Sequence, residues 1–126
     1  MPARSVLVVD DNPLVRRMLC ELFTREGDFD VCGEAENGRE GIEKAQLLSP
    51  NLIVTDLSMP VMNGLEETRV LKRLMPAVPV ILFTAHSDPI VEREAREAGV
   101  SAVVSKSEAV AVLITKARGL LDQIAA

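Results

Sequence analysis

The sequence predicts an α/β domain in which a five-stranded parallel sheet is covered by helices on both faces. Three observations support this class. Short apolar runs without polar alternation recur along the chain, which is typical of strands buried on both faces. Stretches with helical apolar spacing separate them, and proline, glycine and capping residues mark the boundaries. The 126 residues, 48% apolar and 26% charged, suit one domain spanning residues 1–126.

The predicted strands cover residues 6–9, 31–32, 52–54, 78–83 and 102–104. A helix is expected after each of them. In the first helix, apolar side chains recur three and four positions apart along one side, and arginine and glutamate occupy the other, as in an amphipathic helix packed on a sheet. Asn12-Pro13 and Asp88-Pro89 each place a capping side chain before a proline, so helices are expected to begin there.

The ends of the first four helices are expected at residues that stop a helix or precede a proline: Gly27, Ser49, Met75 and Gly99. Ser107 is the expected cap of the last helix, which runs to about residue 124. Because strands and helices alternate strictly, right-handed crossovers predict a doubly wound sheet. The expected strand order is 2-1-3-4-5, as in flavodoxin-like folds, with five flanking helices.

The composition argues against several classes of partner. A net charge of -5 argues against direct binding of nucleic acid or anionic lipid, which need clustered lysine and arginine. No apolar run approaches the roughly 20 residues that a membrane helix needs, and residues 1–5 show no signal-peptide layout. Cys20 and Cys32 have no metal or redox spacing, which favours reduced thiols and a cytoplasmic protein.

Polar residues suited to phosphate chemistry follow four of the predicted strands: Asp10 and Asp11, Asp56, Thr84, and Lys106. In the order 2-1-3-4-5 the first and third strands are neighbours at the switch point, so the three carboxylates should converge. Converging carboxylates repel one another, and Mg²⁺, which prefers oxygen ligands, relieves that repulsion. A lysine can bind a phosphoryl oxygen or a free carboxylate. The set therefore predicts Mg²⁺-dependent phosphoryl transfer to a carboxylate.

Four motifs carry these residues: Val8-Val9-Asp10-Asp11-Asn12, Asp56-Leu57-Ser58-Met59-Pro60-Val61-Met62-Asn63-Gly64, Thr84-Ala85 and Lys106. In order and spacing they resemble the receiver domains of bacterial two-component response regulators, over nearly the whole chain. The resemblance implies a phosphorelay in which a histidine kinase, or a small phosphodonor, phosphorylates Asp56.

The resemblance also implies the roles of the other residues. Asp11, Asp56 and the backbone carbonyl of Ser58 contact Mg²⁺, and Asp10 assists through water. Lys106 and the hydroxyl of Thr84 meet the phosphoryl group, and Thr84 pulls its loop inward as the switch. Such a domain is not an enzyme with a separate substrate, since it catalyses only its own phosphorylation and dephosphorylation.

Two positions depart from the family pattern. Receivers often carry an aromatic residue three positions before the lysine, where this chain has Val103, so the rotating-ring part of the switch is missing. Many have proline after the lysine, where this chain has Ser107. Receivers joined to helix-turn-helix output domains of the nitrate-regulator type often lack that proline as well, and Asn63-Gly64-Leu65-Glu66 is similar to that subgroup. If the chain is the first domain of a longer regulator rather than a stand-alone receiver, a DNA-binding output and transcription are expected.

Two further features lead to hypotheses. His86 and Ser58 occupy positions that in the family border the path of the attacking water, so we predict that they set the lifetime of the phosphorylated state. An exposed loop histidine without a role is the simpler interpretation of His86. The apolar run 109–114 covers every side of the last helix, so part of it should face a dimer mate, an output partner or solvent.

Other functions fit the residues less well. A haloacid-dehalogenase-type phosphatase needs a second aspartate two residues after its nucleophile, and this chain has Asn12 there. A flavin site needs a phosphate loop rich in Ser, Thr and Gly after the first strand, where Asp10 and Asp11 would repel phosphate. Nucleotide hydrolysis needs a Gly-rich loop ending in Gly-Lys-Ser or Gly-Lys-Thr, and this chain has none. One alternative remains open because the aromatic residue is missing at Val103: the chain is a degenerate receiver that acts only as a protein-interaction scaffold.

Overall fold

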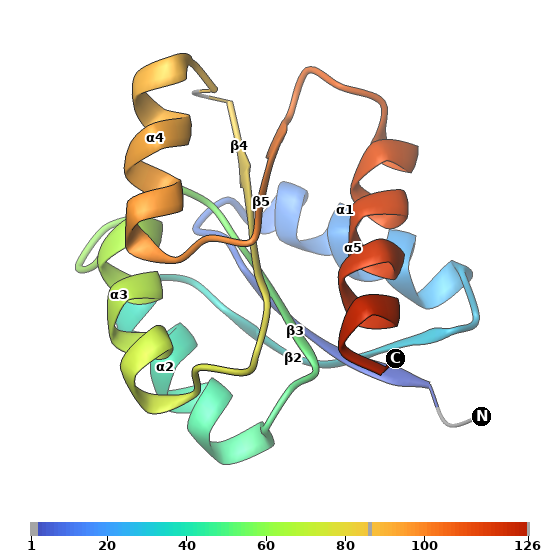
Figure 1. Cartoon of the computed structure of the whole chain (residues 1–126). Coiled ribbons are helices and arrows are strands. Elements are labelled where there is room, and N and C mark those ends of the chain that lie inside the picture. Colours follow the sequence, from blue (N-terminus) through green and yellow to red (C-terminus); the bar gives the residue numbers. More distant parts are fainter. Residues whose placement is uncertain (1–2, 86, 126) are drawn as a thin grey trace.

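Five parallel strands form one sheet with helices on both faces in the computed structural model of the chain (Figure 1). The structure describes residues 3–85 and 87–125, with the side chain of residue 125 excepted. In chain order the elements are β1 (Arg4–Val9), α1 (Pro13–Arg25), β2 (Phe29–Ala35), α2 (Gly38–Leu48), β3 (Leu52–Thr55), α3 (Gly64–Leu74), β4 (Val80–Thr84), α4 (Pro89–Ala98), β5 (Ala102–Ser105) and α5 (Val110–Ala125). The strand order β2-β1-β3-β4-β5, with every pair parallel, confirms the predicted topology.

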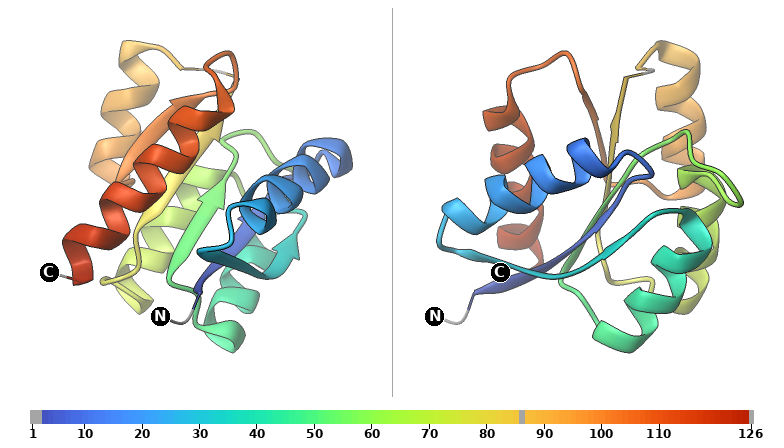
Figure 2. Two further views of the ribbon diagram at one scale, coloured as in Figure 1. Left: turned by 90° about the vertical axis from the view of Figure 1, so that its right-hand side faces the viewer. Right: turned by 180° about the vertical axis from the view of Figure 1, so that it is seen from behind.

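The two faces of the sheet carry different helices. α1 and α5 cover one face, and α2, α3 and α4 cover the other (Figure 2). Beneath α1 and α5 the core includes Phe23 and Phe29, whose rings meet edge to face with centroids 5.0 Å apart. On the other face one cluster centres on Leu7 and Leu71, and another lies beneath α4. Because the central strands are buried on both faces, their ends are firm supports for the side chains that follow.

Most predicted helix boundaries are confirmed. The side chain of Asn12 accepts hydrogen bonds from two backbone N–H groups of the first turn of α1, and that of Asp88 does the same for α4. Ser49 ends α2 with φ 49° and Gly99 ends α4 with φ 102°, both in the left-handed region. Gly27, with φ 77°, follows the cap of α1. The punctuation residues thus set the helix lengths, and with them the positions of the strand ends.

The strands differ from the predicted ranges by one to three residues at several ends, and two of the wrong boundaries have a clear physical reason. β4 begins at Val80 rather than at residue 78, because Pro79 has no N–H to donate to a strand ladder. Ser107 does not cap the last helix. Its N–H and hydroxyl are bound to the Ser105 side chain in a tight turn, and α5 begins only at Val110.

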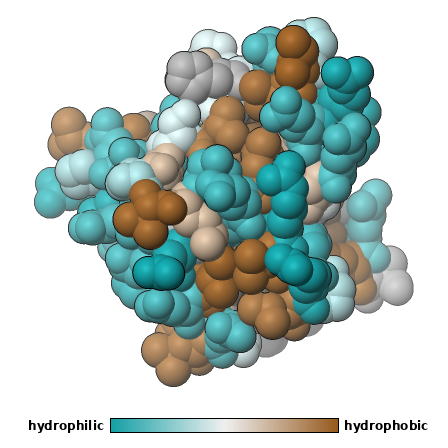
Figure 3. All heavy atoms as spheres, turned by 90° about the vertical axis from the view of Figure 1, so that its left-hand side faces the viewer, coloured by the Kyte–Doolittle hydropathy of each residue, from teal (hydrophilic) through white to brown (hydrophobic). Residues whose placement is uncertain are grey.

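The face built by α2, α3 and α4 shows apolar side chains between polar ones (Figure 3). Leu47, Leu74 and Ile90, one from each helix, are among the exposed large apolar residues. Single exposed apolar side chains are normal at protein surfaces, so these carry no functional argument. Within residues 3–85 and 87–125 no helix has both the length and the apolar character needed to cross a bilayer.

Both ends of the described chain lie near the amino-terminal ends of the strands. β1 begins there and α5 ends there, while the carboxyl ends of the strands lie on the opposite side of the domain (Figure 1). The Arg4 guanidinium and the Asp122 carboxylate, 2.9 Å apart, connect the start of β1 to the last turns of α5. The strand ends that carry the predicted site are therefore remote from both ends.

Candidate functional site

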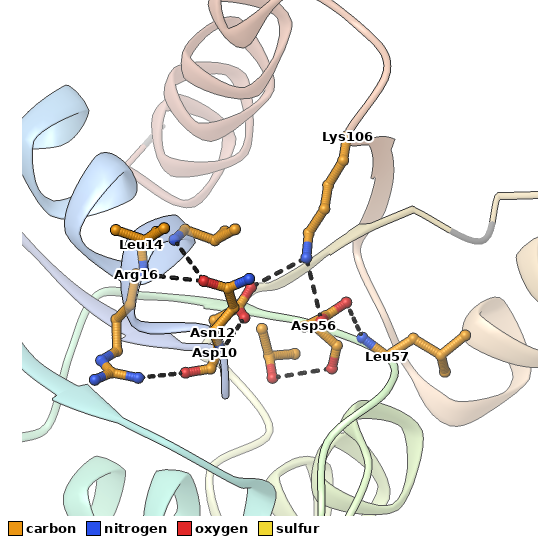
Figure 4. A network of polar contacts seen from close by, with 9 residues as sticks. Asp10, Asn12, Leu14, Arg16, Asp56, Leu57 and Lys106 are labelled. Atoms are coloured by element: carbon orange, nitrogen blue, oxygen red, sulfur yellow. Dashed lines mark hydrogen bonds and ion pairs between the residues drawn. The ribbon is translucent and has the colours of Figure 1, made fainter.

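Three carboxylates gather at the carboxyl ends of the neighbouring strands β1 and β3, and Figure 4 shows two of them, Asp10 and Asp56. Asp10 and Asp11 follow β1 and Asp56 follows β3, and one oxygen of each lies within 4.8 Å of the others. Asp10 is 1% exposed and Asp56 is 7% exposed, whereas Asp11 faces solvent. The predicted convergence of these three side chains is confirmed.

Backbone hydrogen bonds fix the two buried carboxylates. The Asp56 N–H donates to the Val9 carbonyl at 3.1 Å, which ties the end of β3 to the end of β1. One oxygen of Asp10 accepts from the Asn12 N–H at 2.9 Å, and one oxygen of Asp56 accepts from the Leu57 N–H at 2.8 Å. Each carboxylate therefore presents its second oxygen to the centre of the cluster.

Lys106 bridges these second oxygens. Its ammonium nitrogen lies 3.2 Å from an oxygen of Asp10 and 3.2 Å from an oxygen of Asp56 (Figure 4). Its backbone N–H donates to the Thr84 carbonyl at 2.8 Å, so β4 positions the lysine beside the acids. Burial lowers the pKa of Lys106, but the charges of Asp10 and Asp56 together raise it by more. The pKa of Lys106 is therefore above its ordinary value. Lys106 is thus a fixed positive charge at neutral pH.

One lysine does not neutralise the cluster. Burial raises the pKa of Asp10, and the charge of Asp56 raises it again, and these effects outweigh the Asn12 hydrogen bond and Lys106, which lower it. The pocket therefore favours added positive charge. Its donors are carboxylate oxygens, which are the ligands that Mg²⁺ prefers, so the residues present fit a divalent cation of this kind.

We expect Asp10→Asn to raise the free energy of unfolding in Mg²⁺-free buffer at pH 7 by about 1 kcal/mol, because it removes a buried charge that repels Asp56. The same substitution should remove most of the stabilisation that Mg²⁺ gives the wild type. Urea unfolding with and without Mg²⁺ measures both effects, with the exposed Asp30→Asn as control. A destabilised Asp10→Asn protein that still gains full stability from Mg²⁺ would contradict this account.

The other predicted site residues have different surroundings. Thr84 is the fully buried last residue of β4, opposite Ser105 of β5. Ser58 is exposed in the loop after Asp56, and its expected role as a carbonyl ligand stays a prediction. Val103 is half-buried and packs against the apolar cluster beneath α4, where it borders a pocket of about 170 Å³ between α4 and β5. His86 lies outside the described residues, so its role also stays a prediction.

Glu67 was not predicted as part of this region. It lies on α3, is fully buried and accepts a hydrogen bond from the hydroxyl of Thr55, the residue before Asp56. The sequence carries one signal for it: Glu67 follows Gly64 by three positions and precedes Leu71 by four, on the buried side of the helix. An acidic residue within that apolar stripe is unusual and indicates a buried acid.

Comparison with known proteins assigns the family. Residues 6–118 match the response regulator receiver domain. The chain is also 35% identical over 103 residues to the chemotaxis protein CheY of Thermotoga maritima, an alignment that covers 82% of this chain and 85% of CheY. The chain therefore belongs to the response regulator receiver domain family.

Solved structures agree. A two-component response regulator of the LuxR family from Aurantimonas sp. SI85-9A1 superposes with a TM-score of 0.92 at 30% identity, over 96% of this chain and 86% of that one. The receiver domain of the NarL regulator from Mycobacterium tuberculosis shares the fold, with a TM-score of 0.87 at 24% identity over 98% of each chain. The neighbours thus include regulators of the predicted subgroup. The chain spans only 27% and 46% of the lengths of two relatives that are 42% and 35% identical to it.

Proposed function

We propose that this domain is a phosphoacceptor switch in which Asp56 takes a phosphoryl group from a histidine kinase and thereby controls an output domain or partner. The observation that carries the proposal is the position of Asp56. Its buried carboxylate shares a cluster with two further aspartates and has the Lys106 ammonium at 3.2 Å. Such an arrangement suits transfer to a carboxylate, because catalysis of phosphoryl transfer is mostly positioning and neutralisation of charge.

Each residue has a role in this proposal. Asp10, Asp11, Asp56 and the Ser58 carbonyl would hold Mg²⁺, which when bound neutralises charge on the carboxylates and the incoming phosphate. An oxygen of Asp56 forms the new bond to phosphorus as the bond between phosphorus and its donor breaks. Lys106 then exchanges its contact with Asp56 for one with a phosphoryl oxygen. The hydroxyl of Thr84 donates to the same group, and His86 and Ser58 tune its hydrolysis.

The readout of the switch is also part of the proposal. No aromatic ring stands at Val103, so movement of the Thr84 loop has to carry the signal. In α5, Val110 is 41% exposed and Ala111 is exposed, whereas Leu113 and Ile114 are buried, so part of the apolar run does face outward. This exposed part of α5 is the proposed contact for a dimer mate or an output partner, with no direct contact between this chain and nucleic acid.

Incubation with acetyl phosphate and Mg²⁺ tests the central step. Intact-mass measurement should show one added phosphoryl group on the wild type and none on Asp56→Asn, and removal of Mg²⁺ with a chelator should prevent the addition. An Asp11→Asn variant should react far more slowly, while the exposed Asp30→Asn should behave as the wild type. Equal labelling of wild type and Asp56→Asn would refute the proposal.

Beryllofluoride, which mimics a phosphoryl group, separates a live switch from a scaffold. A live switch should bind it only with Mg²⁺, and binding should shift the amide resonances of Thr84 and α5. Absence of shifts at both places would favour the degenerate receiver that acts only through protein contacts, which the lack of a ring at Val103 keeps as the second candidate.

A further inference from the structure

Glu67, on α3, is an acidic residue enclosed between α2 and the end of β3. Its side chain has no exposed surface. One carboxyl oxygen accepts a hydrogen bond from the Thr55 hydroxyl at 2.6 Å, and the other has no hydrogen-bond partner among the described residues. The backbone of α2 packs directly onto the carboxyl group, since a methyl group added at Gly41 would lie 2.3 Å from the unpartnered oxygen.

These surroundings favour the uncharged acid. Burial raises the pKa of Glu67 from 4.5 to about 8, and the Thr55 hydrogen bond lowers it only in part. The other charged side chains of the surrounding elements have partners of their own or face solvent: Arg4 and Asp10 at the two ends of β1, Arg39, Glu40, Glu43 and Lys44 of α2, Asp56 after β3, and Glu66, Arg69, Lys72 and Arg73 of α3. None of them offsets a negative charge at Glu67. Glu67 therefore keeps its proton at neutral pH.

The helix that carries Glu67 also holds the backbone of Asp56. Gly64, the first residue of α3, lies so close to the Asp56 carbonyl that an added methyl group would be 2.1 Å from its oxygen. The Gly64 N–H donates to the Leu57 carbonyl at 3.0 Å, on the far side of Asp56. Glu67, one turn further along, binds Thr55 on the near side. The first turns of α3 thus hold the chain on both sides of Asp56.

We propose that Glu67 is a positioning residue for the phosphoacceptor: as an uncharged acid it lets α2 and α3 pack closely beside the end of β3, and loss of its proton separates the two helices, displaces α3 and slows phosphorylation of Asp56. The inference rests on the proposed function of Asp56. It follows from the geometry because an ionised carboxylate in this position needs water or a cation, and neither can approach without separating α2 from α3. The displaced helix is the one that fixes Asp56.

The rate of phosphorylation by acetyl phosphate with saturating Mg²⁺, followed by intact mass from about pH 6.5 to 9.5, tests the proposal. With a pKa of about 8, the uncharged fraction of Glu67 falls about tenfold between pH 7 and pH 9. The wild-type rate should fall by a similar factor relative to Glu67→Gln, which cannot ionise and still offers an oxygen to Thr55. The ratio of the two rates cancels changes in the phosphodonor and in the pocket. Glu43→Gln, exposed on α2, should follow the wild type.

A second variant keeps the test decisive if Glu67→Gln folds poorly. Thr55→Val removes the hydrogen bond that lowers the pKa of Glu67, so the midpoint of the decline should move to higher pH. A constant ratio of wild-type to Glu67→Gln rates, or an unmoved midpoint in Thr55→Val, overturns the role of Glu67. Absence of phosphate on the wild type at every pH instead overturns the function proposed for Asp56, so the two failures are distinguishable.

Discussion

Glu67→Leu is expected to make the domain more stable at pH 8 by about 3 kcal/mol, and to have little effect at pH 4. Above pH 4.5 an unfolded chain releases the Glu67 proton, whereas the folded chain keeps it until about pH 8. The unfolded state thus binds fewer protons throughout this window, and the free energy of unfolding falls as the pH rises. The stabilising effect of the folded-state proton, up to about 5 kcal/mol, is fully present below pH 4.5 and is lost by about pH 8. Leucine has no such proton, and loss of the Thr55 contact offsets part of the gain.

Guanidinium unfolding of both proteins between about pH 4 and pH 9 measures this effect as a difference in slope. The comparison cancels every other group that titrates. Glu43→Leu, at an exposed position of α2, should keep the wild-type slope. Parallel stability curves for wild type and Glu67→Leu would show that Glu67 is ionised or hydrated in the folded protein.

Gly64→Ala should have the opposite effect and lower the free energy of unfolding by about 3 kcal/mol or more. The new methyl group would lie 2.1 Å from the Asp56 oxygen and 3.0 Å from its carbonyl carbon. Both atoms belong to the backbone, so either α3 or the Asp56 peptide has to move. Phosphorylation by acetyl phosphate should therefore fall steeply as well.

Gly119→Ala is the matched control for this substitution. Gly119 lies within α5, and nothing comes within 4 Å of a methyl group added there. Since alanine favours a helix over glycine, this change should raise stability by about 0.5–1 kcal/mol. Thermal or urea unfolding and the phosphorylation rate measure both variants. A Gly64→Ala protein as stable and as reactive as Gly119→Ala would mean that the close packing of α3 on Asp56 is unimportant.

The fold and the acidic cluster could be predicted from the sequence because their signals are local. Buried parallel strands appear as uninterrupted apolar runs, and Asn12 and Asp88 mark helix starts next to prolines. Once the strand order is known, topology alone places Asp10 and Asp56 at adjacent strand ends. No long-range packing detail is needed for these conclusions.

The predictions that were wrong or missing concern residues whose contacts depend on groups outside their own sequence segment. Serine is a residue type that often caps helices, but the Ser107 N–H donates to the Ser105 hydroxyl in a turn instead. Glu67 lies in the apolar stripe of α3, but this position alone does not show how closely another helix packs against it. Its burial depends on Gly41, which belongs to another helix and lets the two backbones approach closely. The close packing of two helices cannot be predicted from the sequence of either helix alone.

The beginning of β1 and the end of α5 meet at the Arg4–Asp122 ion pair, so both ends of the described chain lie at the amino-terminal ends of the strands, away from Asp56. A further module joined at either end would start there, away from the acidic cluster. Under the proposed function, such a module would shield Asp56 from a phosphodonor only if it folded back around the sheet to the opposite ends of the strands.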